Sequence, residues 1–397
     1  MTRLVFNKPF TQQEPISDAA IAAAVAVMKT GRLHRYNTVG EEAGAAAELE
    51  AAYAGYQDVD YCLATTSGGT AMQLALRACG VKPGDAVVTN AFTLAPVPGA
   101  IAAVSGRPVF VDTTANLTVD LDDLGAKLAA SGAKVFMLSH MRGHIAPMEA
   151  LCDIVAKHGA MLIEDCAHTM GARWNGVRSG NFGAAACFST QTYKHMNSGE
   201  GGFLTSNDPN IMARATVMSG SYMLYGRHGA APAEAHFDQA RWEVPNCSSR
   251  MDNLRAAILL PQIETLDASI ERWNARYRRL EAGLAEADST TLTVRPPQEH
   301  YVGSSFQFLM PEGTGDDSAR ALVARCGQRG VDLKWFGDAN PVGFTSRYDS
   351  WTYAEAQPLP RTLDVLQRVM DLRVPLSFTE DDCGVIAQII REELAGV

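Results

Sequence analysis

Three short stretches of the sequence carry groups suited to chemistry, and each follows an apolar run of strand length. Residues 67–70 (SGGT) follow YCLATT and open a helical segment, Asp165 ends AMLIED, and Ser189 ends AAACFS. Lys194 comes five residues after Ser189 and is the one lysine of its neighbourhood. Because ligands of an open α/β sheet bind at the carboxyl ends of its strands, we expect the three stretches to meet in space.

Each stretch alone also has an ordinary explanation. A Gly-Gly pair is common in tight strand-to-helix turns, and an aspartate after a strand often caps a helix. A lone loop lysine is usually a solvated surface charge, and a lone histidine such as His168 is more often structural than a ligand. The functional prediction therefore rests on the three stretches occurring together.

Together the stretches offer backbone amides for an anion, a carboxylate for a buried cation, and a primary amine. Pyridoxal phosphate needs all three, because its phosphate favours a helix N-terminus, its pyridinium N–H a carboxylate, and its aldehyde a lysine. A lysine in a partly desolvated site has a lowered pKa, so its free amine can attack and shuttle protons. The sequence predicts a pyridoxal-phosphate enzyme with Lys194 as the Schiff-base lysine.

The elements that position these groups follow an alternating pattern. Between residues 61 and 208, short apolar runs alternate with helical segments, which indicates an α/β fold with a mostly parallel sheet covered on both faces. A charged amphipathic helix is predicted over 266–287, followed by mixed α+β texture. We expect a large cofactor-binding domain over 1–265 and a small C-terminal domain over 266–397.

Composition narrows the class of protein. The chain has 397 residues, 47% of them hydrophobic, and a net charge of −10, which disfavours nucleic acid and anionic membranes as partners. Its eight cysteines form no CxxC, so neither a disulfide framework nor a metal site is expected. The N-terminus lacks an apolar signal region, and no stretch approaches ~20 apolar residues. We expect a cytoplasmic protein.

The motifs resemble those of the DegT/DnrJ/EryC1/StrS family, the sugar aminotransferases among fold-type I pyridoxal-phosphate enzymes. The similarity extends over nearly the whole chain and is nearest to the cyclitol aminotransferases of scyllo-inosose type and the aminohydroxybenzoate synthases. The motifs that carry it are SGGTAMQLAL, KPGDAVVTNAFT, RPVFVD, IEDCAHTMGA, CFSTQTYKHMNSGEGGFLTSND and RMDNLRAAI.

The resemblance implies a role for each matching residue. Lys194 would form the Schiff base, Asp165 would pair with the pyridinium nitrogen, and His168 would lie near the cofactor's 3-oxygen. Gly69, Thr70 and Ser189 would hold the phosphate, and the rest of the implied cofactor-binding set is Gly68 and Gln191. An asparagine before the RM segment would reach the phosphate of a neighbouring subunit, which implies a homodimer or a dimer of dimers.

The sequence departs from the family pattern at three places. Leu94 stands where a ring-stacking aromatic is usual, so either Leu94 or Phe92 must serve. Ser248 stands where the family has its cross-subunit asparagine, and Asn246 lies two residues earlier. Arg142 and His144 follow a strand end beside the family's His-x-x-Gly, and either substrate contact or loop surface would explain them.

The leading functional hypothesis is an aminotransferase that moves an amino group from glutamate or glutamine to a keto-sugar, a keto-cyclitol or a related ketone, with pyridoxamine phosphate as intermediate. Sugar 3-dehydratases, which resemble the family, carry histidine in place of the lysine, so Lys194 argues against them. An aromatising dehydratase of the aminohydroxybenzoate synthase type stays open. A non-catalytic regulator on the same fold is the hypothesis of another class.

Overall fold

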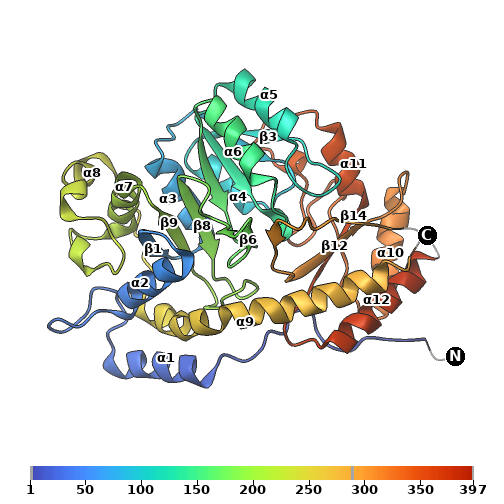
Figure 1. Cartoon of the computed structure of the whole chain (residues 1–397), viewed down its shortest axis with the longest axis horizontal. Helices are drawn as coiled ribbons and strands as arrows, with labels where there is room; N and C mark the ends of the chain where they lie inside the picture. The colour runs from blue at the N-terminus through green and yellow to red at the C-terminus, as the bar shows by residue number, and fades with distance from the viewer. Residues whose placement is uncertain (1–2, 288–289, 396–397) are drawn as a thin grey trace.

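A computed structural model describes residues 3–287 and 290–395 of the chain (Figure 1). Its centre is a seven-stranded sheet in the order β1-β9-β8-β5-β4-β2-β3. The run from β8 to β3 is parallel, and β9 is antiparallel to both of its neighbours. The strands are β1 (Tyr61–Thr65), β2 (Ala86–Asn90), β3 (Arg107–Val111), β4 (Val135–Ser139), β5 (Met161–Asp165), β8 (Ala185–Ser189) and β9 (Gly202–Ser206).

Helices surround this sheet and continue into the C-terminal part of the chain. The α-helices are α1 (Asp18–Thr30), α2 (Ala45–Gln57), α3 (Gly68–Ala78), α4 (Pro96–Ala103), α5 (Leu121–Ser131), α6 (Met148–Lys157), α7 (Pro209–Gly220), α8 (Phe237–Glu243), α9 (Asn253–Leu284), α10 (Asp316–Gln328), α11 (Pro360–Arg368) and α12 (Glu380–Leu394). Short 3-10 turns are η1 (Met141–Gly143), η2 (Tyr225–Arg227), η3 (Glu234–His236) and η4 (Tyr348–Ser350).

Both faces of the large sheet are buried, which explains the continuous apolar runs of its strands. In β4, Phe136 and Leu138 pack into a core with α2, α5, α6 and α9. Val135 and Met137, which alternate with them, pack into a second core with α3, α4 and α7. The alternation of side chains along a strand therefore feeds two cores, and the predicted α/β architecture with helices on both faces is confirmed.

The C-terminal part forms a smaller antiparallel sheet in the order β10-β12-β14-β13. Its strands are β10 (Thr291–Leu292), β12 (Ser305–Leu309), β13 (Lys334–Trp335) and β14 (Val369–Arg373). A third sheet, β11-β6-β7, joins the two parts of the chain because β11 (Glu299–His300) pairs with β6 (Arg173–Trp174), which is followed by β7 (Val177–Arg178).

The core of the C-terminal part also includes residues from the start of the chain. Phe6 and Phe10 are buried with residues of α10, α12 and the small sheet. Their rings meet Phe378 edge-on, at centroid distances of 5.0 and 4.9 Å. The first segment of the chain thus completes a core that is otherwise built from residues beyond 276.

Helix α9 connects the two parts of the molecule. Its first half packs Leu259 and Leu266 into the core of the large sheet, and its second half packs Tyr277 and Leu280 into the C-terminal core. Figure 1 shows this gold helix running beneath both sheets. The expected domain boundary at 265 falls inside α9, so the division at that residue remains a prediction.

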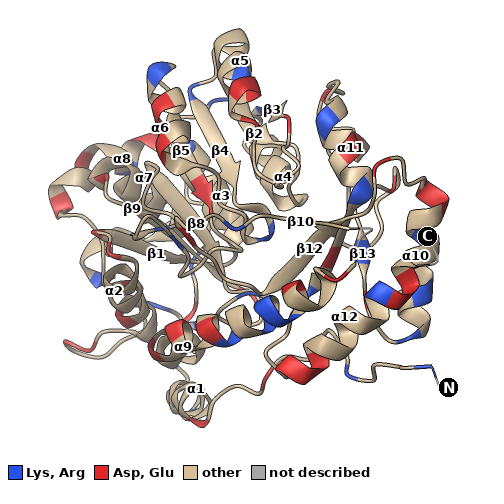
Figure 2. Ribbon diagram, turned by 45° about the vertical axis from the view of Figure 1, so that its right-hand side comes forward, with Lys and Arg blue, Asp and Glu red and all other residues tan. Residues whose placement is uncertain are grey.

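The outer helices carry mixed charge. In Figure 2 the ribbon colours show acidic residues interspersed with basic ones along α9 and α10. The chain as a whole has a net charge of −10. Among the described residues, no helix combines the length and hydropathy that a membrane span needs. All eight cysteines are free thiols.

Candidate active site

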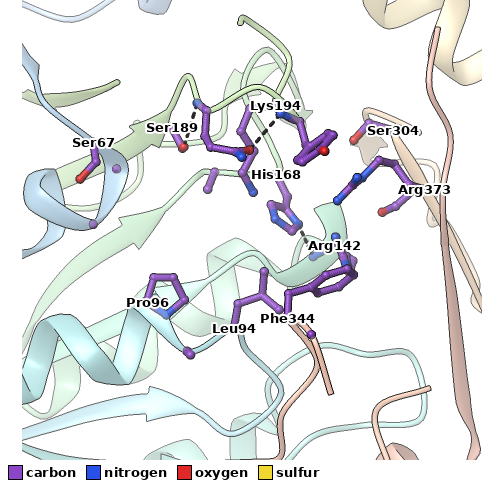
Figure 3. Close-up of a pocket in the computed structure, with 18 of the residues that line it drawn as sticks. Ser67, Leu94, Pro96, Arg142, His168, Ser189, Lys194, Ser304, Phe344 and Arg373 are labelled. Carbon is purple, nitrogen blue, oxygen red and sulfur yellow. Dashed lines mark hydrogen bonds between the residues drawn. The ribbon is translucent and has the colours of Figure 1, made fainter. Parts of the chain in front are cut away.

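The three stretches singled out by the sequence meet at the carboxyl ends of β5 and β8. A cavity of about 100 Å³ lies there, and its lining includes Gly68, Gly69, Asp165, His168, Ser189 and Lys194. A wider cavity of about 640 Å³ shares Lys194, His168 and Ser189 with it. Figure 3 shows Ser67 and Ser189 at one end of this space and Arg373 at the other.

The N-terminus of α3 forms one end of the site. Ser67 caps the helix, because its Oγ accepts a hydrogen bond from the Thr70 N–H at 3.0 Å. A Cβ on Gly68 would lie 2.9 Å from the Ser189 Cβ and 3.2 Å from the Phe188 carbonyl oxygen, so only glycine lets the helix start this close to β8. First-turn N–H groups lack carbonyl partners within the helix, so this end can hold a phosphate.

Asp165 is buried at the end of β5. Its Oδ2 accepts a hydrogen bond from the Ser139 Oγ at 3.0 Å, and its Oδ1 accepts one from the Ala167 N–H at 3.1 Å. Burial raises the pKa of this carboxyl, while these donors and the Lys194 ammonium oppose the shift. Its oxygens retain lone pairs for a further donor, and a cationic N–H is the donor that stabilises a buried carboxylate most.

His168 is held by the backbone of Arg142. The Arg142 N–H donates to His168 Nδ1 at 3.0 Å, so the ring proton of the neutral imidazole is on Nε2. Arg142 has φ of 55°, which is uncommon for a residue other than glycine. Burial keeps the pKa of His168 well below its usual range, with the positive charge of Lys194 adding to the effect. The histidine is therefore a neutral hydrogen-bond donor at Nε2.

Lys194 lies in the loop that follows β8. Its N–H donates to the Gln191 carbonyl at 2.8 Å, and the Gln191 N–H donates to the Ser189 Oγ at 3.3 Å. Burial lowers the pKa of Lys194 to about 7, helped by the nearby charge of Arg142 and opposed by Asp165. An amine with that pKa is about half unprotonated at neutral pH, so the free base needed for nucleophilic attack and proton transfer is available there.

Several residues at the site were missed by sequence reasoning. Arg373 ends β14 and lines the wider cavity, and Tyr193 lies under its guanidinium at 3.7 Å. Ser139 ends β4, directly opposite Asp165 in the register of β4 and β5. The strand-end rule that found Asp165 would also have found Ser139, whereas β14 itself was not predicted.

Two residues proposed for the cofactor ring lie in different surroundings. Leu94 lines both cavities. Phe92 lines neither; it is 1% exposed and packs edge-on against Phe336 at 5.3 Å. Of the two, only Leu94 is placed to meet a bound ring.

Thr70 is likewise outside the lining of either cavity. Its Oγ1 lies 2.9 Å from the Ser67 Oγ. Ser67 itself lines the wider cavity. The hydroxyl that faces the cavity at this turn is therefore that of Ser67, and Thr70 supports it from behind.

Asn246 and Ser248 are exposed and line no part of either cavity. The Asn246 Oδ1 accepts hydrogen bonds from the Ser248 N–H at 2.9 Å and the Ser248 Oγ at 3.2 Å. Within one chain they do not reach the site, so the role expected for them, contact with a neighbouring subunit's phosphate, remains a prediction.

The structure separates Arg142 from His144. Arg142 lines the wider cavity and pairs with Asp371 of β14 at 2.8 Å. His144 is fully enclosed, with its Nε2 2.8 Å from the Gln307 Oε1, and burial keeps its pKa well below the usual range. Gln307 in turn donates to Asp371 at 2.7 Å. Arg142 is available to a substrate, and His144 helps to hold Asp371 behind it.

His140, Glu164 and Cys166 also lie together beneath the site. The Glu164 carboxylate accepts hydrogen bonds from the backbone N–H groups of Gly180, Phe182 and Gly183, and the His140 Nε2 lies 3.0 Å from its Oε2. These bonds already engage both oxygens of the Glu164 carboxylate. The cluster therefore has a structural role, in which Glu164 holds the loop over residues 180–183 against the end of β5.

Comparisons with known proteins show the family and the fold of the chain. The family model for the DegT/DnrJ/EryC1/StrS aminotransferase family matches residues 15–391. An L-glutamine:2-deoxy-scyllo-inosose aminotransferase from Streptomyces kanamyceticus is 30% identical over 74% of this chain and 67% of its own length. A pleiotropic regulatory protein from Geobacillus stearothermophilus is 33% identical over 58% of each chain, so the match spans little more than half of that relative.

Among solved structures, 3-amino-5-hydroxybenzoic acid synthase superposes with a TM-score of 0.83. It is 25% identical, and the superposition covers 99% of this chain and all of that one. The match of the family model extends from before α1 into α12 and includes every residue of the site. The chain therefore belongs to the DegT/DnrJ/EryC1/StrS aminotransferase family.

Proposed function

We propose that the protein is a pyridoxal-phosphate aminotransferase that moves an amino group from glutamate or glutamine to a ketone of the sugar or cyclitol class. One observation carries the proposal: the amine of Lys194, the carboxylate of Asp165, the imidazole of His168 and the N-terminus of α3 all line one cavity. Family membership and the inosose aminotransferase among the relatives support the substrate class.

The residues present fit the cofactor at each of its polar ends. The N–H groups at the start of α3, with Ser67 and Ser189, would hold the phosphate. Asp165 would accept a hydrogen bond from the ring nitrogen, and the Nε2–H of His168 would donate to the 3-oxygen. Leu94 would cover one face of the ring.

The bound cofactor would supply an electron sink for the carbon from which the amine departs. Asp165, as a carboxylate, would keep a proton on the ring nitrogen and so maintain the pull on electrons. Lys194, with a pKa near 7, would take a proton from the substrate carbon bonded to the transferred nitrogen. It would then give that proton to the cofactor carbon bonded to the same nitrogen. The same lysine would serve both halves of the reaction, with amine donor and ketone acceptor bound in turn.

Two other functions are distinguished by simple measurements. An aromatising dehydratase of the aminohydroxybenzoate synthase type has the same fold, and it would release water without accepting nitrogen. A regulator would need neither the amine nor the carboxylate; this chain retains both, as Lys194 and Asp165.

The test uses the protein loaded with pyridoxal phosphate. A visible absorbance band that borohydride bleaches would mark a covalently held cofactor. Addition of L-glutamine or L-glutamate should convert the band to that of the pyridoxamine form, and scyllo-inosose or a nucleotide-linked keto-sugar should restore it with one amine transferred. Loss of water without nitrogen transfer would identify the dehydratase, and absence of any band would remove the enzymatic proposal.

A further inference from the structure

The charged side chains that line the wider cavity are mainly positive. Two arginines line it, Arg142 and Arg373, against one carboxylate, the exposed Glu200, and Lys194 adds a partial positive charge at neutral pH. The two histidines in the lining add no charge, because burial lowers the pKa of His195 to about 3 and keeps that of His168 well below its usual range. A ligand that fills this cavity therefore meets an excess of cations.

Arg373 differs from Arg142 because its charge has no ion-pair partner among the described residues. Arg142 pairs with Asp371, but no carboxylate among the described residues lies within 4.0 Å of Arg373, and it makes no side-chain hydrogen bond there. Its guanidinium lies over the Tyr193 ring at 3.7 Å and 5.9 Å from the centre of the Phe344 ring. A guanidinium stacked on an aromatic ring keeps its N–H edge free for a planar acid group.

Arg373 is fixed in place by the small sheet. It is the last residue of β14, and its backbone pairs with Ser305 of β12, another residue of the cavity lining. Burial and the like charge of Arg142 lower the pKa of Arg373. Both effects disfavour the guanidinium cation, and a bound anion would relieve them. Figure 3 shows Arg373 extending from the side of the small sheet toward the centre of the site.

We propose that Arg373 forms an oxyanion subsite for the amino acceptor, which is an acidic ketone carrying a carboxylate or a phosphate. This inference rests on the proposed function and names its substrate class. The donor's own carboxylate, attached to the reacting carbon, must lie near Lys194. Arg142 is the arginine tied to the reactive groups, because its backbone N–H bonds His168 Nδ1 and its charge acts more strongly on Lys194. It therefore serves the donor carboxylate and leaves Arg373 for a group farther along the acceptor.

The test is a binding titration of the enzyme loaded with pyridoxamine phosphate, the form that receives the acceptor. Two matched pairs of probes separate the sources of the anion: 5-keto-D-gluconate with L-sorbose for a carboxylate, and dihydroxyacetone phosphate with dihydroxyacetone for a phosphate. The wild-type enzyme should bind the acidic member of at least one pair about 10-fold or more tightly than the neutral member, as expected for a charge-assisted bidentate contact.

Variants connect that preference to the residue. Arg373→Gln should weaken binding of the favoured acidic ketone by about 10- to 100-fold and leave the neutral one unchanged. Arg373→Lys should fall between, because it keeps the charge and loses the planar pair of donors. Arg278→Gln removes an equal charge from an exposed position on α9 and should change neither. Unchanged melting temperature and cofactor content would show that the variants are folded.

The inference is overturned if the wild-type enzyme binds acidic and neutral ketones alike, or if Arg373→Gln keeps the preference. An effect of Arg373→Gln on L-glutamate binding to the pyridoxal form alone would also overturn it, because the subsite would then serve the donor. Since the titration needs no turnover, absence of amine transfer would count against the proposed function and not against this subsite.

Discussion

At the scale of single residues, Arg142 connects the groups of the site. Its N–H fixes the protonation of His168, its guanidinium pairs with Asp371, and its charge lowers the pKa of Lys194. The unusual φ of 55° is what lets one residue direct its backbone and side chain to these different partners. The site therefore depends on a loop conformation as much as on its reactive groups.

Lys194→Ala should abolish amine transfer and leave the fold intact, because it removes the reactive amine without removing core volume. The variant should still bind pyridoxal phosphate, but without the band that borohydride bleaches. Transfer of amine from L-glutamate, followed by amino-acid analysis, measures the loss. Residual activity above about 1% of wild type, equivalent to a loss of less than roughly 2.7 kcal/mol in transition-state stabilisation, would assign the proton transfer to another group.

The lowered pKa of Lys194 predicts a pH dependence of cofactor capture. Below pH 7 the amine is an ammonium, so the rate of covalent attachment to the apoprotein should rise about tenfold per pH unit and level off above pH 7. Stopped-flow absorbance measures this rate. A rate that keeps rising to pH 10 would mean that the amine has an ordinary pKa.

The same shift affects stability with a defined sign. The folded apoprotein releases the Lys194 proton near pH 7, whereas the unfolded chain holds it up to about pH 10.5. Because the unfolded state binds more protons in this window, burial of Lys194 makes stability rise with pH between about 7 and 10.5. Denaturation of apo wild type compared with apo Lys194→Met should show this rise in the wild type only.

Asp165→Asn should keep the covalent attachment of the cofactor but lower kcat strongly. The neutral amide cannot hold the proton on the ring nitrogen, although it can still accept a hydrogen bond from Ser139. The spectrum of the loaded variant and its single-turnover rate with L-glutamate separate attachment from chemistry. An unchanged rate would mean that a different carboxylate pairs with the ring.

At the scale of elements, the start of α3 depends on contact with the end of β8. Gly68→Ala would bring a methyl group to 2.9 Å from the Ser189 Cβ, so the helix start must move away from β8. Overpacking of this kind costs about 1–3 kcal/mol, and we expect weaker binding of pyridoxal phosphate in a fluorescence titration. Gly55→Ala in α2 is the control, because its Cβ would meet nothing within 4 Å. Equal affinities in both variants would contradict a phosphate site at α3.

The elements also show what the sequence could and could not predict. The strands that end at Asp165 and Ser189 were predicted because both faces of the large sheet are buried. Such strands appear in the sequence as short, continuous apolar runs. The first half of α9 was missed because Pro261 lies within it, and a proline removes a helical hydrogen bond. Residues 360–373 were not assigned, although they form α11 and β14. Arg373 was therefore missed, because a strand-end argument needs the strand.

At the scale of the whole molecule, Asn246 and Ser248 are exposed and lie away from the site of their own chain. We therefore expect their partner to belong to another subunit. We predict a homodimer, or a dimer of dimers, in which Asn246 approaches the partner's phosphate, and most such assemblies close by two-fold symmetry. Size-exclusion chromatography with light scattering gives the state. Mixing inactive Lys194→Ala chains with Asn246→Ala chains tests the shared site, because one of the two sites in a mixed dimer then carries neither lesion.

Each mixed dimer should recover up to half of the activity of a wild-type dimer. Asn246→Ala must first be impaired alone, and subunit exchange must be verified by tagging one variant. No recovery under these conditions would show that Asn246 acts within its own chain.

The packing of Phe6 and Phe10 against Phe378 affects the order in which the protein can form during synthesis. Residues 6 and 10 leave the ribosome more than 360 residues before their partner does. Until then two aromatic rings have no core to enter, while the large sheet can already assemble from residues up to 206. The C-terminal core, and Arg373 at its edge, is therefore completed last, after the strand ends that carry Asp165 and Ser189 have been made.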